Sequence, residues 1–241
     1  MRVAALYDIH GNAAALEAVL SEIPTDATVV LGGDIALGPQ PAETLALLDA
    51  LVARADWVRG NCERREPHAD ELWERRRLWV EKELGQERSK ALAELPATVV
   101  LEVDGLGPTL FCHGSPRSDE EMITVVTQDG RLAAILEGVE ERTVVCGHTH
   151  HQFDRSHGDH RVVNAGSVGM PYEGRPGAYW TLLGPGVEHR RTEYDLDAAA
   201  VGIRASGYPD PDELVELLTS PPTAREAAEH FEAQAVAKAA P

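Results

Sequence analysis

Five short apolar segments of the chain each end in residues of the types that bind metal ions. They are Asp8 and His10 after residues 3–7, Asp34 after 27–31, Asn61 after 57–58, His113 after 110–112, and His148 with His150 after 143–146. Carboxylate, imidazole and amide groups together suit divalent ions such as Mn, Fe, Ni or Zn. The chain has no Cys-x-x-Cys pair, which argues against a structural zinc site built from thiolates.

Each of these residues, taken alone, has an ordinary structural explanation. An aspartate or a Gly-Asn pair after a strand is usually part of a turn, and a histidine there is more often hydrogen-bonded than metal-bound. Their common position favours a site, because the carboxyl ends of strands in an open α/β sheet meet at the edge where ligands bind. Two ions would need a shared ligand, and Asp34 is the candidate, since Gly32 and Gly33 let the backbone approach closely.

The segments that must position these residues alternate between strand and helix patterns. An apolar stripe over residues 13–23 and a proline in the first turn of 41–53 predict helices between the first three strands, and the charged segment 64–95 predicts surface helices. This alternation predicts a parallel sheet covered by helices. Further strands are predicted at 98–103 and 109–112, as a hairpin around a glycine-containing turn, and at 143–146, 161–164, 178–183 and 187–194.

The chain changes in character near residue 196. Beyond it the sequence is alanine-rich and helical in pattern, and it is interrupted by Pro209, Pro211, Pro221 and Pro222. We therefore predict a domain over 1–195 and a helical C-terminal extension over 196–241 that packs on the same domain. The sequence does not choose among three roles for this tail: a lid, a contact in a homo-oligomer, or a simple packed extension.

Composition limits the function classes. The formal net charge of −18 repels long nucleic acids, although bound divalent ions would reverse the field locally. Three cysteines, Cys62, Cys112 and Cys146, do not form a disulfide framework. The N-terminus lacks the pattern of a signal peptide, and no apolar stretch has membrane-spanning length. These features predict a cytoplasmic protein that does not bind membranes.

The motifs that contain these residues resemble those of the calcineurin-like metallophosphoesterase superfamily, and its small prokaryotic phosphodiesterase-like branch in particular. The matching segments are Asp8-Ile9-His10-Gly11-Asn12, Gly33-Asp34, Gly60-Asn61, His113-Gly114 and Gly147-His148-Thr149-His150. The glycine-rich segment 164–169 is similar to one in small prokaryotic members. The tail beyond about residue 196 has no counterpart in this resemblance.

The resemblance implies an α/β fold, a four-layer α/β/β/α sandwich with the site at one edge of the sheets. It implies two divalent metal ions, with Mn expected and Fe, Ni or Zn as alternatives. Asp34, Asn61 and His113 are the predicted catalytic residues, and a bridging water or hydroxide would attack phosphorus in line with the leaving group. The implied ligands are Asp8, His10 and His150 for one ion, Asn61, His113 and His148 for the other, and Asp34 for both.

The predicted function is hydrolysis of phosphate esters, as a phosphodiesterase or phosphatase acting on a small soluble substrate. A dinucleoside-polyphosphate hydrolase or a nuclease is the alternative among enzymes. A non-catalytic protein-interaction scaffold is the alternative of another class, since a eukaryotic retromer subunit shares this fold. The complete set of seven ligand positions favours the enzyme. Asn12 and Arg175 are candidate substrate contacts, with a turn residue and a surface charge as equal alternatives.

Cys62 departs from the pattern of many members, which have a histidine after Gly-Asn that is thought to assist the leaving group. Here Gly60-Asn61 is followed by Cys62 and Glu63. A cysteine at this position is similar to the branch of small bacterial and archaeal phosphodiesterases. We expect Cys62 to be a small packed residue without a chemical role, so that protonation of the leaving group is weak.

Overall fold

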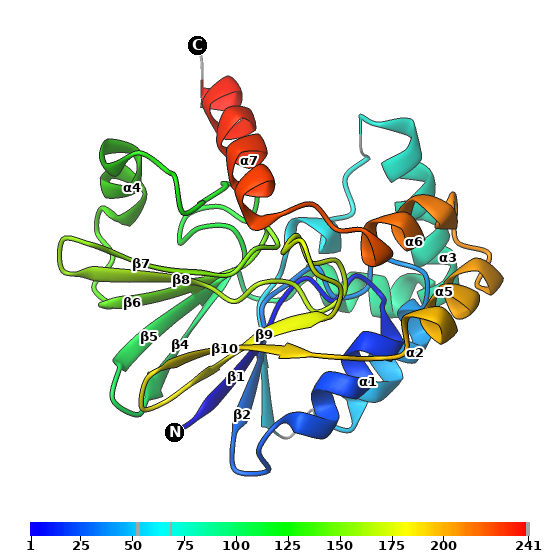
Figure 1. Cartoon of the computed structure of the whole chain (residues 1–241), viewed down its shortest axis with the longest axis horizontal. Coiled ribbons are helices and arrows are strands. Elements are labelled where there is room, and N and C mark those ends of the chain that lie inside the picture. Colours follow the sequence, from blue (N-terminus) through cyan, green and yellow to red (C-terminus); the bar gives the residue numbers. More distant parts are fainter. Residues whose placement is uncertain (52–53, 68, 240–241) are drawn as a thin grey trace.

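The computed structural model describes residues 1–51, 54–67 and 69–239, and contains two five-stranded sheets that face each other (Figure 1). The first sheet has the order β10-β9-β1-β2-β3, with bounds Val187–Thr192, Ala178–Leu183, Val3–Leu6, Thr28–Leu31 and Ala55–Trp57. The second has the order β4-β5-β6-β8-β7, with bounds Thr98–Val103, Gly107–Cys112, Thr143–Cys146, His160–Asn164 and Phe153–His157. Both sheets are mixed, with β1, β2 and β3 parallel in the first and β5, β6 and β8 parallel in the second.

Alternation along the strands divides the hydrophobic core into layers. Val3, Ala5 and Tyr7 pack between the two sheets, whereas Ala4 and Leu6 belong to the cluster under the helices outside the first sheet. Those helices are α1 (Ala13–Glu22), α2 (Pro41–Asp49) and α3 (Glu71–Ala93). Successive side chains of a strand point to opposite faces, so a strand with both faces covered is apolar at every position.

The second sheet shows the same division. Phe111 packs between the sheets, and its neighbours Leu110 and Cys112 pack outward against Leu132 and Ile135 of α4 (Asp129–Leu136). Figure 1 shows α4 outside one sheet and α1 with α2 outside the other. The predicted four-layer α/β/β/α architecture is therefore confirmed.

Three helices form the C-terminal part of the chain: α5 (Leu196–Ala205), α6 (Pro211–Thr219) and α7 (Ala224–Ala239). Ile203 of α5 and Leu214 of α6 share a small apolar cluster with Met170. Glu232 of α7 accepts a hydrogen bond from Arg131 at 2.6 Å and ties this helix to α4. The helices agree with the predicted helical tail, whereas the division of the chain at residue 195 stays a prediction.

Several details differ from the sequence prediction. The first sheet was expected to be parallel, but β9 runs antiparallel to β1, and β10 runs antiparallel to β9 at the edge of the sheet. The helix predicted over 41–53 ends at Asp49, and residues 52–53 of that range lie outside the described chain. The segment 64–95 contains one long helix, α3, with a break at Gly85, where φ is 79°. The sequence pattern missed β7 and α4, which are only five and eight residues long.

None of the helices in the described ranges combines the length and the apolar character needed to cross a membrane.

Candidate metal centre

Left-handed backbone conformations are concentrated at the predicted metal ligands. Non-glycine residues with positive φ in the described chain are Asp8, His10, Asp34, His148, His150 and Asp210. Five of the six are predicted ligands, each located after the end of a strand. Such a conformation costs on the order of 1–3 kcal/mol per residue and persists where the surroundings enforce it, most often at functional sites. The backbone thus marks the same edge of the sheets as the sequence motifs.

Two glycines let the ligand loops approach one another. A Cβ on Gly33, whose φ is 96°, would lie 2.5 Å from the backbone nitrogen of Gly60 and 2.7 Å from Nδ1 of His113. A Cβ on Gly60 would collide with the carboxylate of Asp34. The sequence analysis expected Gly33 to admit close backbone approach, and here it brings the loops after β2 and β3 into contact.

The predicted ligands form two groups that share Asp34. One donor atom from each of Asp8, His10, Asp34 and His150 lies within 4.8 Å of the others, and the same holds for Asp34, His113 and His148. Nε2 of His10 lies 3.2 Å from Nε2 of His150, which is 3.1 Å from Oδ1 of Asp8. All six side chains are buried or nearly so.

Asn61 joins the second group. Its Oδ1 lies 3.0 Å from Nε2 of His113, and that nitrogen is 3.4 Å from Oδ1 of Asp34. The structure therefore brings together all seven residues that the motifs predicted as ligands, which come from the five loops after β1, β2, β3, β5 and β6.

Backbone carbonyls orient three of the imidazole rings. Nδ1 of His10, His113 and His150 lies 3.1, 2.8 and 2.7 Å from the carbonyl oxygens of Leu37, Gly32 and Met170, respectively. A carbonyl only accepts hydrogen bonds, so each Nδ1 carries a proton. The lone pair of each Nε2 then faces the centre, which is the arrangement of a metal-binding histidine.

The centre holds an excess of hydrogen-bond acceptors. With these tautomers, Nε2 of His10 and Nε2 of His150 face each other as two acceptors at 3.2 Å. Oδ1 of Asp8 and Nε2 of His148 are buried and make no hydrogen bond within the described chain. Burying acceptors without partners is costly, and divalent cations would satisfy them. The donor set therefore fits a divalent metal site.

The buried carboxylates of Asp8 and Asp34 also favour positive charge at the centre. Burial lowers the pKa of His113, but the Asp34 and Asp8 carboxylates outweigh it and raise that pKa to about 10. Burial and the neighbouring His113 lower the pKa of His148 to about 4. Burial raises the pKa of Asp34, yet His113 and the other histidines hold it well below its usual range. In the chain without metal, His113 is therefore protonated on both nitrogens. Its positive charge compensates the carboxylates in the way that a bound cation would.

Glu63 fixes the loops that carry Asp34 and Asn61. Its carboxylate accepts hydrogen bonds from the backbone N–H groups of Asp34, Ile35 and Gly60 at 2.8, 2.8 and 2.9 Å. Burial and the nearby Asp34 carboxylate raise the pKa of Glu63 to about 7. The sequence analysis assigned Glu63 no role, although a glutamate three residues after Gly60 is the spacing at which a side chain returns to the backbone of a turn.

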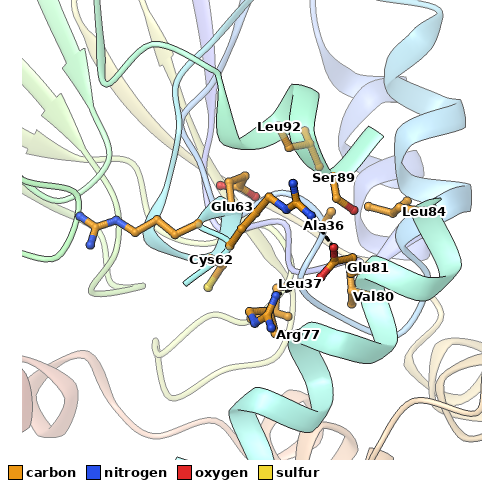
Figure 2. Close-up of a pocket in the computed structure, with 12 residues that line it drawn as sticks. Ala36, Leu37, Cys62, Glu63, Arg77, Val80, Glu81, Leu84, Ser89 and Leu92 are labelled. Carbon is orange, nitrogen blue, oxygen red and sulfur yellow. Dashed lines mark hydrogen bonds and ion pairs between the residues drawn. The ribbon is translucent and has the colours of Figure 1, made fainter. Parts of the chain in front are cut away.

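Cys62 lies directly against Asp34. Its backbone N–H donates to Oδ1 of Asp34 at 2.9 Å and its thiol donates to Oδ2 at 3.0 Å. Burial and the Asp34 carboxylate raise the pKa of the Cys62 thiol well above its usual value, so the thiolate is disfavoured. Figure 2 shows Cys62 and Glu63 beside a cavity of about 40 Å³ against α3, which is too small for a substrate.

Asn12 and Arg175 have other contacts. Asn12 is fully buried; it accepts a hydrogen bond from the N–H of Ala15 at the start of α1 and donates to the carbonyl of Gly169. The Arg175 side chain is 67% exposed and pairs with Glu193 at 3.1 Å. These contacts support local structure, and the role of both residues as substrate contacts stays a prediction.

The glycine-rich segment 164–169 supports the loop after β1. The Ser167 hydroxyl and the N–H of Gly169 both donate to the carbonyl oxygen of Asp8, at 2.7 and 3.0 Å. These bonds hold Asp8 in its left-handed conformation. The sequence analysis identified the segment by resemblance but did not predict this function.

Comparisons with known proteins agree with this geometry. A family model described as the calcineurin-like phosphoesterase superfamily domain matches residues 1–183. A metallophosphoesterase from Sphaerobacter thermophilus is 26% identical, with a TM-score of 0.72 over 90% of this chain and 98% of that one. A hypothetical protein from Pyrococcus horikoshii OT3 is 23% identical, with a TM-score of 0.79 over 91% and 98%, and shows the same fold. No curated protein matches the chain.

Proposed function

Since the chain belongs to the calcineurin-like phosphoesterase superfamily, we propose that it is a dinuclear metal-dependent hydrolase of phosphate esters. The observation that carries the proposal is the pair of ligand groups that share Asp34 and hold more buried acceptors than donors. Asp8, His10 and His150 would hold one ion, Asn61, His113 and His148 the other, and Asp34 both. Mn is the proposed metal, with Fe, Ni and Zn as alternatives for the same donors.

The residues of the chain would orient the metal ligands and exclude bulk water from the buried centre. When bound, two divalent ions neutralise phosphoryl oxygens and lower the pKa of a coordinated water. The carbonyl bonds of His10, His113 and His150 hold their Nε2 atoms in place. Cys62 is held as a neutral thiol, so it is not a nucleophile, and we propose that Asp34, Asn61 and His113 act through the metals rather than by covalent attack.

A cavity of about 350 Å³ next to the centre suits a small substrate. It is lined by Asn61 and His148 and by five charged residues, Arg64, Arg77, Lys238, Glu66 and Glu120. This volume lies within the range of sites for small molecules, and the net charge of −18 repels long nucleic acids. We therefore propose a small soluble phosphate ester, cleaved by phosphodiesterase or phosphatase chemistry, and a cytoplasmic location.

A substrate panel tests the proposed function. The chain is stripped of metal with a chelator, supplied with Mn²⁺, and assayed with bis(p-nitrophenyl) phosphate, p-nitrophenyl phosphate and a dinucleoside polyphosphate. We expect hydrolysis of at least one compound, lost with chelator and restored with Mn²⁺. A chain that binds Mn²⁺ but cleaves none of them would instead favour the non-catalytic scaffold.

The leaving group should control the rate. Without a histidine at position 62, protonation of the leaving group is weak, and general acid help is typically worth about 10²- to 10⁴-fold. We expect bis(p-nitrophenyl) phosphate to be cleaved much faster than an alkyl monoester such as glycerol phosphate, as judged by kcat/KM with Mn²⁺. Equal values for the two would mean that another residue supplies the proton.

Cys62→Ala should retain most of the activity. The Cys62 N–H that donates to Asp34 survives the substitution, and only the bond from the thiol is lost. The measurement is kcat/KM on the aryl diester together with metal content. A large loss of rate at unchanged metal content and melting temperature would give the thiol a chemical role.

A further inference from the structure

A second cavity lies beside the metal centre, between α3 and α6. Its volume is about 240 Å³, and His10 lines it, so it is continuous with the proposed metal site. The remaining wall is mostly apolar and includes Leu37, Trp73, Tyr208, Leu214 and Leu217. We call it the α3/α6 cavity. Leu214 and Leu217 come from the C-terminal helices, outside the residues 1–183 that the family model matches.

The cationic side chain in its wall is already neutralised. Arg76 pairs with Glu213 at 2.6 Å, and its guanidinium also donates to the carbonyls of Pro209 and Asp210. The same guanidinium lies over the rings of Trp73 and Tyr208, 5.8 and 5.4 Å from their centroids. Arg76 therefore fixes the two rings in place and leaves no excess positive charge to bind an anion in this cavity.

Tyr208 offers the cavity a polar atom. Tyr208 is 6% exposed and lines the cavity. An occupant with a polar atom at its far end could form a hydrogen bond with the Tyr208 hydroxyl.

The two cavities beside the centre differ in chemistry. The larger, about 350 Å³, borders Asn61 and His148 and is lined by the charged residues Arg64, Glu66, Arg77, Glu120 and Lys238. The α3/α6 cavity borders His10, and its wall is mostly apolar and aromatic apart from Asp70, Arg76 and Glu213. Leu37 and Trp73 line both. A phosphate ester at the centre would thus have a strongly charged space and a more apolar space beside it.

We propose that the α3/α6 cavity binds a planar aromatic group of the substrate, and that this chain is selective for phosphate esters that carry such a group. This inference rests on the proposed function, because the phosphoryl group must lie at the metal centre for the ring to reach the cavity. The C-terminal helices then determine specificity: α6 supplies the wall that a ring would contact.

Two non-hydrolysable probes separate ring binding from leaving-group chemistry. Phenylphosphonate and methylphosphonate carry the same anionic group and differ only in the ring. On the Mn²⁺-loaded chain, isothermal titration should give a dissociation constant at least about tenfold lower for phenylphosphonate, the effect of burying one ring. Leu217→Trp, which fills the cavity, should bring the ratio close to one and leave methylphosphonate binding unchanged. The matched control is Glu216→Trp, on the exposed side of the same helix, which should keep the wild-type ratio.

The outcomes separate the two proposals. If neither probe binds the wild-type chain, the centre does not accept phosphoryl groups, and the proposed function and this inference both fail. If both bind equally, or if Leu217→Trp keeps the wild-type preference, the cavity is not a ring site although the proposed function stands.

A second measurement does not depend on how Leu217→Trp folds. 4-Nitrophenylphosphonate should quench tryptophan fluorescence of the wild-type chain, because Trp73 lines the cavity. Tyr208→Leu, at a residue that lines the α3/α6 cavity and not the larger one, should weaken the binding of this probe and leave methylphosphonate binding unchanged. Absence of quenching in the wild-type chain at saturating probe would overturn the inference.

Discussion

Asp34→Asn is expected to lose both metal ions and nearly all phosphoesterase activity. Asp34 is the residue shared by the two ligand groups, and its carboxylate faces histidines on both sides, with Nε2 of His10 at 3.8 Å and Nε2 of His113 at 3.4 Å. Asparagine keeps the size of the side chain but removes the charge that offsets repulsion between two nearby cations. Loss of residues that only support a ligand typically costs about 10- to 100-fold, so kcat/KM should fall by more than about 100-fold.

Elemental analysis of the purified variant measures the metal content beside the assay. Asp154→Asn is the control, because Asp154 is a carboxylate of the second sheet that pairs with Arg161 and belongs to neither ligand group. That control should keep the wild-type metal content and activity. An Asp34→Asn chain that still holds two ions would show that Asp34 does not bridge them.

Glu63→Gln is expected to weaken both the fold around the site and metal binding. The carboxylate of Glu63 accepts three backbone hydrogen bonds, from Asp34, Ile35 and Gly60. A glutamine turns one oxygen into an NH₂ group that faces a backbone donor and leaves it unsatisfied. An unsatisfied buried donor costs about 1–3 kcal/mol, and the loop that carries Asp34 loses its restraint. We expect a lower melting temperature of the metal-free chain and an affinity for Mn²⁺ reduced by about 10- to 100-fold.

Glu81→Gln is the control for this prediction. Glu81 lines the same small cavity as Glu63 (Figure 2) but pairs with Arg65 and Arg77 on the side of α3. The control should match the wild type in Mn²⁺ affinity, measured by titration calorimetry. Unchanged melting and unchanged Mn²⁺ affinity in Glu63→Gln would mean that its three hydrogen bonds do not support the site.

The strands that carry the site could be predicted because their signal is local. The segments that became β1, β2 and β6 are short and apolar, and Asp8, Asp34 and His148 follow them within three residues. Buried parallel strands are apolar throughout, so their ends are visible in the sequence. The direction of β9 was not visible, because antiparallel pairing of Ala5 with Thr181 depends on contacts between distant parts of the chain.

The site also combines residues that a local pattern predicts with residues that only long-range contacts bring together. The predicted ligands were found by residue type, whereas Glu63 and Ser167 act through backbone groups of residues 29 and 159 positions away. The spacing of Gly60 and Glu63 indicates only the local one of the three Glu63 bonds, and no local pattern indicates the long-range bonds. The wall of the α3/α6 cavity has the same origin: Leu217 has the pattern of any amphipathic helix, and only the packing of α6 near His10 places it beside the site.

The most direct test of the central claim is calorimetric titration of the metal-free wild-type chain with Mn²⁺, with hydrolysis of bis(p-nitrophenyl) phosphate followed in parallel samples. The account predicts that two ions bind per chain, that hydrolysis appears as they bind, and that a chelator abolishes it. Binding of fewer than two ions, or hydrolysis that a chelator leaves unchanged, would contradict a dinuclear metal-dependent phosphoesterase.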